Sequence, residues 1–428
     1  MAYYKRMVDE QIKDYLDAFG AVCIEGPKWC GKTTSAKQIA GSVLELQDTD
    51  KREEYLATAQ TKPSFLLEGK PPRLIDEWQD APVLWDAVRV AVDRRQQTGQ
   101  FILTGSSTAN TDETAHTGTG RIATLPMLPM SLYESGESSG EVSLGSLFDS
   151  PSCEVSGHSG MEIEDLIFAA CRGGWPAALF PQTERGKLLV AKNYVKTVCD
   201  KDISKAAGEK LDPRIAKNIL RSYARNISTL AEKTTILADV TSSNDSLARS
   251  TFDKYVSVLE KLFVIQDIDA WNPSIRSKTA IRSGAKRGFC DPSVAVAALG
   301  VGPMQLHTQL KTFGFIFESM CIRDLKAYSA RQGGEISYYR DRYGLEADVV
   351  LHLEDGRYAL IECKLGSREI EEGAQHLLQI RSLVRGHNEK EGQVPLREPD
   401  LLIVLTGGQM AYTRADGVKV IPLGCLKD

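Results

Sequence analysis

The segment GPKWCGKT (26–33) constrains the fold of this chain more than any other, because it fits the Walker A pattern G-x-x-x-x-G-K-[ST] in full. The apolar run AVCIEG (21–26) leads into it, and TTSAKQIAGSV continues from it with helical composition. In a strand–loop–helix unit the glycines let successive N–H groups point at a phosphate, and the helix N-terminus adds positive charge. The segment therefore predicts a phosphate-binding loop in an α/β domain.

Each position of this loop is a candidate contact to ATP. Lys32 is expected to reach the β and γ phosphates, and the Thr33 hydroxyl to coordinate Mg²⁺. The predicted ATP-binding residues are Gly26, Pro27, Lys28, Trp29, Cys30, Gly31, Lys32, Thr33 and Thr34.

The segment LIDE (74–77) supplies a second half to this site. We expect Asp76 at the end of an apolar strand, where it can hold the Mg²⁺ hydration shell, with Glu77 placed to polarise the attacking water. An acidic pair after an apolar run could also cap the next helix. In a chain with a complete Walker A loop, the catalytic reading is the stronger one.

Further residues are candidates for orienting the attacking water or for stabilising the charge that develops on the phosphate. At the end of FILTGSS (101–107), Thr104 or Ser106 could orient the water, although such residues also make ordinary turns. Arg121 and Arg172 are candidate arginine fingers, to be weighed against surface salt bridges.

Alternation along the chain gives the domain organisation. Short apolar strands alternate with helical stretches over 1–134, which predicts a mostly parallel sheet. The Ser- and Gly-rich stretch 135–160 is expected to be a flexible insertion. Residues 161–270 read as helical and 271–428 as a further strand–helix–strand domain. Within 229–268, two helices followed by an apolar strand suggest a winged helix-turn-helix.

The winged-helix segment does not by itself show whether it binds DNA or protein. Its apolar positions Phe252, Val256, Leu259 and Leu262 are spaced for a core. Its basic residues Arg249, Lys254 and Lys261 could contact DNA or form a plain solvated face, and many winged helices bind only protein.

The stretch EADVVLHLEDGRYALIECKLG (346–366) carries the spacing of a PD-(D/E)xK nuclease centre. Asp348 would open one strand of a hairpin, and Glu362 and Lys364 would share one side of the return strand. Asp348 and Glu362 are candidate ligands of a second Mg²⁺, with Lys364 beside the attacking water. Glu318, Gln375 and Glu346 are additional polar groups for this site. The E-x-K motif alone is common. A nuclease-like fold also does not by itself establish cleavage of nucleic acid.

Composition narrows the setting. The net charge of −5 provides no global basic field, so contact with nucleic acid would need a local patch. The nine cysteines are dispersed without a CxxC pair, which is typical of reduced thiols. There is no apolar signal-peptide core and no run near the roughly 18 apolar residues of a membrane span. We expect a cytoplasmic protein with no membrane partner.

Several motifs together resemble one known family. GPKWCGKTT, LIDEWQ, ILTGSS, GRIATLPMLPMSLYE, RGGWPAAL, LEKLFVIQDIDAW and KRGFCDPSVA occur in the order found in prokaryotic AAA-like ATPases that carry the domain of unknown function 4143. The resemblance implies ATP binding and hydrolysis, a winged-helix middle and a restriction-endonuclease-like C-terminal domain. This chain departs from the family in the length of 135–160 and in Trp175, where a tyrosine is usual.

Two functions remain in view. The first is a Mg²⁺-dependent ATPase whose nucleotide state controls a winged-helix and nuclease-like module acting on nucleic acid, with double-stranded DNA as partner. The alternative is an ATPase switch for protein partners with an inert nuclease-like scaffold. A small-molecule kinase has less support, because Asp76-Glu77 is the hydrolytic arrangement. Nuclease activity, the oligomeric state and the cis or trans action of an arginine stay open.

Overall fold

The computed structural model describes residues 3–105, 117–241, 247–274 and 283–428. The chain divides into two compact units, Met1–Pro129 with Lys261–Phe263, and Met130–Glu260 with Val264–Asp428. The first unit therefore ends slightly before the expected boundary at 134. The expected helical region and C-terminal domain both fall within the second unit, apart from Lys261–Phe263.

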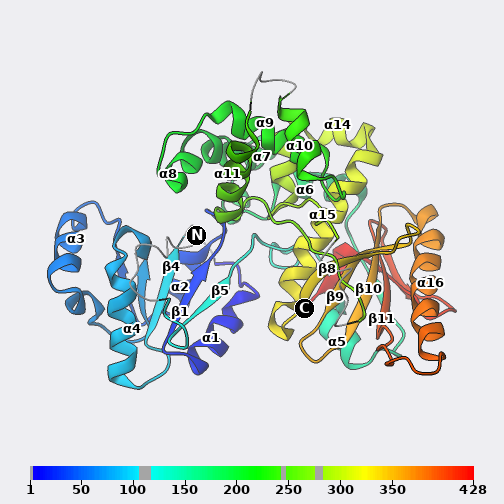
Figure 1. Ribbon diagram of the computed structural model, residues 1–428, viewed down its shortest axis with the longest axis horizontal. Coiled ribbons are helices and arrows are strands. Elements are labelled where there is room, and N and C mark those ends of the chain that lie inside the picture. The colour runs from blue at the N-terminus through cyan, green and yellow to red at the C-terminus, as the bar shows by residue number, and fades with distance from the viewer. Residues whose placement is uncertain (1–2, 106–116, 242–246, 275–282) are drawn as a thin grey trace. The chain divides into compact units, whose positions relative to one another are not determined.

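The first unit is built on a five-stranded parallel sheet, as predicted (Figure 1). Its strands stand in the order β2 (Ser42–Glu45), β3 (Arg73–Asp76), β4 (Phe101–Gly105), β1 (Ala21–Glu25) and β5 (Ile122–Pro126). The β4 strand thus lies between the strand that precedes the phosphate loop and the strand that ends in Asp76. Because the strands are parallel, their carboxyl ends meet at one edge of the sheet.

Helices cover both faces of this sheet. On one face α1 (Val8–Ala18) and α2 (Lys32–Ile39) pack over Val22 and Ile24 of β1. On the other face α4 (Val83–Arg95) packs over Ala21 and Cys23. This alternation follows from the two-residue period of a strand whose two faces are both buried. The remaining elements are α3 (Arg52–Thr61) and the short helical turns η1 (Pro63–Leu67) and η2 (Trp78–Asp80).

From Ile163 the second unit continues with helices, most of them in the expected helical stretch 161–270 and the last two beyond it. They are α6 (Ile163–Arg172), η4 (Pro176–Ala178), α7 (Glu184–Thr197), the π-helical turn η5 (Val198–Asp202), α8 (Ile203–Ala207), α9 (Pro213–Arg225), α10 (Lys233–Thr241), α11 (Arg249–Lys261), α13 (Pro292–Leu299) and α14 (Pro303–Thr308). The predicted core residues Phe252, Val256, Leu259 and Leu262 are buried. After α11, isolated antiparallel bridges join Ile265 to Phe289 and Ile268 to Lys286.

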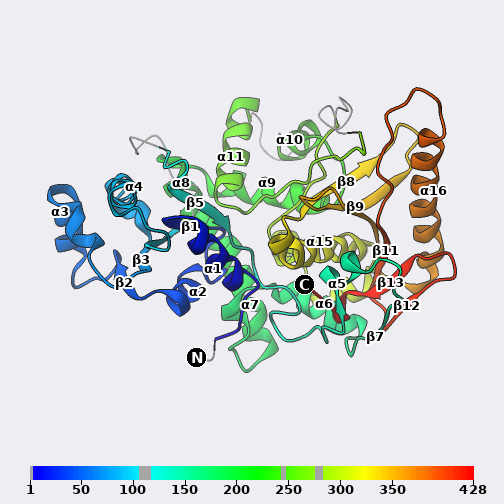
Figure 2. The ribbon, with the colours of Figure 1, turned by 90° about the horizontal axis from the view of Figure 1, so that it is seen from below.

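A seven-stranded sheet forms the rest of the second unit. Its order is β7 (Ser156–His158), β12 (Met410–Thr413), β13 (Lys419–Pro422), β11 (Leu401–Thr406), β10 (Tyr358–Lys364), β9 (Glu346–His352) and β8 (Glu335–Arg340). Figures 1 and 2 show α15 (Leu310–Ser329) and α16 (Ile370–Asn388) on opposite faces of this sheet. The predicted hairpin is present, with β9 and β10 antiparallel. From α15 to β11 the elements follow in the order helix, three strands, helix and strand.

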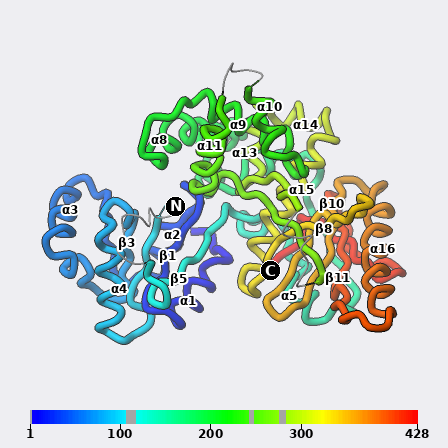
Figure 3. The backbone as a smooth tube through the Cα atoms, viewed as in Figure 1, coloured from blue at the N-terminus to red at the C-terminus, as the bar shows by residue number. Residues whose placement is uncertain are grey.

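The stretch 135–160 differs from the expected flexible insertion. It contains β6 (Val142–Ser143), α5 (Leu144–Asp149) and β7, and β6 and β7 pair with β14 (Leu426–Lys427) and β12. Figure 3 traces this part of the chain beside the C-terminal strands. Its few apolar residues, among them Leu147 and Phe148, are buried, so a polar composition conceals a segment that is held by strand pairing.

Two expectations from composition can be compared with the described residues. No helix among them is both long and apolar enough to cross a membrane. All nine cysteines lie in described segments as free thiols, and only Cys153 is exposed.

Candidate functional site

The phosphate loop connects β1 to α2 and depends on its glycines. Gly26 has a φ of +151°, and a Cβ atom there would lie 2.1 Å from the carbonyl oxygen of Met127. Gly31, at the N-cap of α2, has a φ of +106°. Side chains rarely adopt such backbone angles, so the glycines let the loop turn tightly from strand to helix.

Lys32 closes over its own loop. The side chain is buried, and Nζ donates to the carbonyl oxygens of Gly26 at 2.8 Å and Pro27 at 2.9 Å. These carbonyls hold the ammonium group beside the N-terminus of α2, where the backbone favours an anion. The arrangement fits the role predicted for Lys32 on a phosphate.

Three side chains from three elements converge at the carboxyl edge of the sheet. Thr33, in the first turn of α2, donates from Oγ1 to Asp76 Oδ1 at 2.7 Å. Thr104 on β4 donates to the same oxygen at 2.5 Å. Hydroxyl and carboxylate oxygens are the ligand types that Mg²⁺ prefers, so Thr33 and Asp76 fit the predicted metal role. Thr104, one of the two polar candidates, therefore lies beside Asp76, while Ser106 lies outside the described residues.

Glu77 follows Asp76 in a strained backbone conformation. Its φ is +54°, in the left-handed region, and its carboxylate accepts a hydrogen bond from Gln79 Nε2. Strain of this kind in a non-glycine residue costs on the order of 1–3 kcal/mol and is common at functional sites. Nearby, burial raises the pKa of Glu25, the last residue of β1, to about 6.

Both candidate arginines are engaged by carboxylates within their own units. Arg121 precedes β5, where its carbonyl accepts from Ala21 at the start of β1, and its side chain pairs with Asp93 at 2.8 Å. That position is the amino edge of the parallel sheet, opposite the loop. Arg172 is buried in the second unit in a bidentate pair with Glu137, at 2.7 and 2.8 Å. A buried bidentate pair of this geometry holds structure together.

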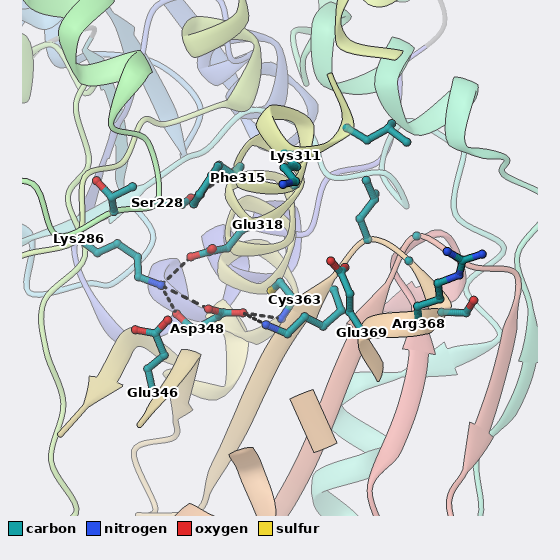
Figure 4. A pocket seen from close by; sticks show the side chains of 18 of the residues that line it. Ser228, Lys286, Lys311, Phe315, Glu318, Glu346, Asp348, Cys363, Arg368 and Glu369 are labelled. Atoms are coloured by element: carbon teal, nitrogen blue, oxygen red, sulfur yellow. Dashed lines mark hydrogen bonds and ion pairs between the residues drawn. The ribbon is translucent and has the colours of Figure 1, made fainter. Parts of the chain in front are cut away.

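A second candidate site lies in the other unit. A cleft of about 1050 Å³ is lined by residues of α15, β9 and β10 and by the segments around Ser228, Lys286 and Gly366 (Figure 4). It gathers the predicted residues Glu318, Asp348 and Lys364. The predicted Glu362 is 1% exposed and lies against Lys364, with Nζ 2.6 Å from Oε2.

Lys286 joins this cluster, although the sequence did not single it out. Its Nζ donates to Glu318 Oε1 at 2.7 Å and to the Asp348 carbonyl at 3.0 Å, as Figure 4 shows. Burial alone would lower the pKa of Lys286, but Glu318 and Asp348 outweigh it and hold the pKa above its ordinary value. Burial raises the pKa of Glu318 to about 8, and burial together with Asp348 raises that of Glu362.

Of the two other residues expected near this cluster, Glu346 lies in the cleft and Gln375 does not line it. Gln375 on α16 is exposed, and its Nε2 donates to Glu371 at 3.0 Å. The next residue, His376, lies beside the cluster, with Nδ1 3.5 Å from Glu362 Oε1. Glu346 lines the cleft but pairs with Arg340 at 3.4 Å. The side chain of α16 that lies beside the cluster is thus His376, one position after the expected Gln375.

The basic residues of α11 are largely neutralised by acids. Arg249 pairs with Asp253 at 3.6 Å, and Lys254 forms a close ion pair with Glu209. Lys261 is exposed. Two of the three basic residues named for this segment are thus in ion pairs with acidic side chains.

Comparison with known protein families finds three matching stretches, two of which lie in the second unit. Residues 18–136 match a family described as an AAA domain, and residues 163–305 and 313–426 match two domains of unknown function, DUF8612 and DUF4143. An uncharacterised protein of Mycobacterium tuberculosis is 22% identical over 360 residues, which cover 84% of this chain and 73% of that protein. An uncharacterised protein of Haemophilus influenzae is 23% identical, covering 71% and 72%.

Among solved structures, the Walker-type ATPase of Pyrococcus abyssi aligns with a TM-score of 0.41 and 12% identity, over 69% of this chain and 96% of that one.

The first unit has the fold of a P-loop ATPase. The parallel sheet, the complete Walker A loop and the AAA-domain match agree on this class. The C-terminal match to DUF4143 agrees with the resemblance drawn from the sequence motifs.

Proposed function

We propose that the chain binds and hydrolyses ATP with Mg²⁺ at the carboxyl edge of the first sheet. The observation that carries this proposal is the meeting of Thr33, Asp76 and Thr104 through one carboxylate oxygen. It brings together the end of the phosphate loop, the acidic strand and the strand between them. A chance G-x-x-x-x-G-K-T match would have no reason to be completed by two other strands.

Each residue takes a role that its position supports. The loop amides and Lys32 bind the phosphates, and Glu77 orients and polarises the attacking water. Thr33 and Asp76 would hold Mg²⁺, which shields the phosphate charge when bound. Thr104 fixes the orientation of the Asp76 carboxylate.

Two variants test this assignment. Lys32→Ala should abolish ATP binding or turnover, because the loop loses its only ammonium group aimed at the phosphates. Glu77→Gln should bind ATP and fail to hydrolyse it. Binding would be followed with a fluorescent ATP analogue and turnover by phosphate release. Lys37→Ala, on the exposed side of the same α2 helix where Lys37 pairs with Glu45, is the matched control and should retain most turnover. Wild-type turnover in Lys32→Ala would remove the assignment.

For the second unit, we propose that nucleotide state controls contact with a protein partner. The ion pairs on α11 favour this alternative over nucleic acid. The order of helices and strands from α15 to β11 supports a restriction-endonuclease-like scaffold, and the segment from α10 through the bridged residues supports a winged helix. ATP turnover should then be the same with and without duplex DNA. Stimulation by duplex DNA that is lost in Lys254→Ala would favour the nucleic-acid reading instead.

A further inference from the structure

The acid cluster of the second unit already contains its counter-charges. Glu318, Asp348 and Glu362 contribute three carboxylates. Lys286 lies 2.7 Å from Glu318 and 4.0 Å from Asp348 Oδ1, and Lys364 lies 2.6 Å from Glu362 and 3.9 Å from Asp348 Oδ2. The two ammonium groups therefore stand between successive carboxylates, where a divalent cation would have to bind.

Lys286 is the fixed member of the pair. Its side chain is 7% exposed, against 21% for Lys364, so Lys364 can turn toward solvent while Lys286 is enclosed. The Asp348 carbonyl also accepts from Lys286, and the Tyr338 ring lies beneath the ammonium at 5.6 Å. Removing a buried lysine from two carboxylates would leave buried charge uncompensated, which is costly.

Each of the three carboxylates also has one oxygen engaged by a donor or an ammonium group. Asp348 Oδ2 accepts from the Cys363 N–H at 2.9 Å, Glu318 Oε1 accepts from Lys286, and Glu362 Oε2 faces Lys364. Within the described segments, Glu362 Oε1 is the cluster's carboxylate oxygen that is buried without a hydrogen bond. A divalent cation at this cluster would have to displace or share these donors, because it needs several oxygen ligands. The described part of the chain also holds no group of three His, Cys, Asp or Glu side chains suited to a metal.

We propose that Lys286 occupies the divalent-cation position of this cluster, so that the second unit as folded binds no metal there. Of the two Mg²⁺ sites expected from the sequence, only the one at the ATP site then remains. The lysine comes from the segment before β8, outside the hairpin that carries the nuclease-like spacing. This inference concerns the second unit and does not depend on ATP hydrolysis in the first.

Binding of Mn²⁺, followed by electron paramagnetic resonance on the full chain, tests the proposal. Asp76→Asn serves as background because it removes the metal ligand of the ATP site. On this background, adding Asp348→Asn should change Mn²⁺ binding little, because no metal is held at Asp348. Adding Lys286→Ala instead should create a new Mn²⁺ site, and Lys286→Ala with Asp348→Asn should lose it again.

Controls separate this result from a general effect of charge. Lys311→Ala removes another lysine of the same cleft and should create no Mn²⁺ site. Circular dichroism checks folding, and Lys286→Met keeps the aliphatic stem if the alanine variant is unstable. The proposal is overturned if the Lys286-containing protein binds a Mn²⁺ ion that Asp348→Asn abolishes. It is equally overturned if a folded Lys286 variant gains none. The first comparison decides even where every Lys286 variant unfolds.

Discussion

Asp76 Oδ1 accepts hydrogen bonds from two hydroxyl groups, and the proposed ATP site rests on this contact between single residues. A carboxylate fixed by Thr33 and Thr104 needs little reorganisation when charge develops nearby. The Thr104 side chain is 1% exposed, so water does not readily replace it as a donor.

Thr104→Val should therefore slow ATP turnover while leaving ATP affinity nearly unchanged. The variant keeps the shape of the side chain and removes one hydrogen bond to a charged group, which corresponds to a loss of about 10- to 100-fold. Steady-state phosphate release and equilibrium ATP binding measure the two quantities. Thr124→Val, at an exposed position of β5, is the matched control. An equal loss in both variants would count against the role of Thr104.

Glu25 predicts a pH dependence of stability. Burial raises the pKa of Glu25 from an ordinary 4.5 to about 6, so folding favours its protonated form. The stabilisation is complete below the ordinary pKa and is lost as pH rises through about 6. Glu25→Gln should consequently raise the unfolding temperature above pH 6 and change it little near pH 4. Thermal unfolding across this range tests the sign, with the exposed Glu53→Gln as control. A larger gain at low pH would contradict it.

The candidate residues differ in how far sequence could place them. Lys32, Thr33 and Asp76 were predictable because short motifs carry their own geometry. Lys286 was missed because it reaches the cluster from a distant segment, and no local spacing signals that approach. Gln375 was chosen on an expected helix, but the helix turns His376 toward Glu362 instead. One residue on a helix is about 100° of rotation, which a pattern of polar residues does not fix.

Strand direction decides the position of Arg121 at the scale of elements. A five-residue strand is about 13 Å long, and Arg121 lies at the end of β5 away from the loop. The sequence supplies the order of strands and helices, and so the parallel sheet. The sequence does not reveal whether a residue next to a strand will lie at the same edge of the sheet as the phosphate loop.

Arg121→Ala should thus leave ATP turnover within about twofold of wild type, since an exposed ion pair such as that with Asp93 contributes little. Turnover at several protein concentrations is the measurement. The variant Arg89→Ala, which removes a neighbouring partner of Asp93, is a suitable comparison. A tenfold loss that grows with concentration would instead indicate an arginine supplied by a second copy.

At the scale of the whole molecule, the Ser- and Gly-rich stretch 135–160 is part of the second unit's framework. Its strand β7 forms one edge of the seven-stranded sheet beside β12. Its strand β6 pairs with β14 in a separate two-stranded sheet. Composition indicated flexibility because the segment has few apolar residues. The partners that order it lie far away in sequence, so no local pattern could identify them.

Deletion of residues 139–158 should therefore lower the thermal stability of the second unit and the yield of soluble protein. It removes β6, α5 and β7 and exposes the edge of β12 to pairing between molecules. A Gly-Ser insertion after Gly392, an exposed turn, is the control and should be tolerated. If the deletion behaves like the insertion, the segment is dispensable.

The pairing of β6 with β14 has a consequence for protein synthesis. The first unit is nearly complete once Pro129 has been translated, so it can fold while the ribosome is still at work. The second unit must hold β6 and β7 without their partners until the last strands emerge. During that interval the edges of β6 and β7 are open to pairing with other chains, and translation that ends early would leave the first unit attached to an unfinished sheet.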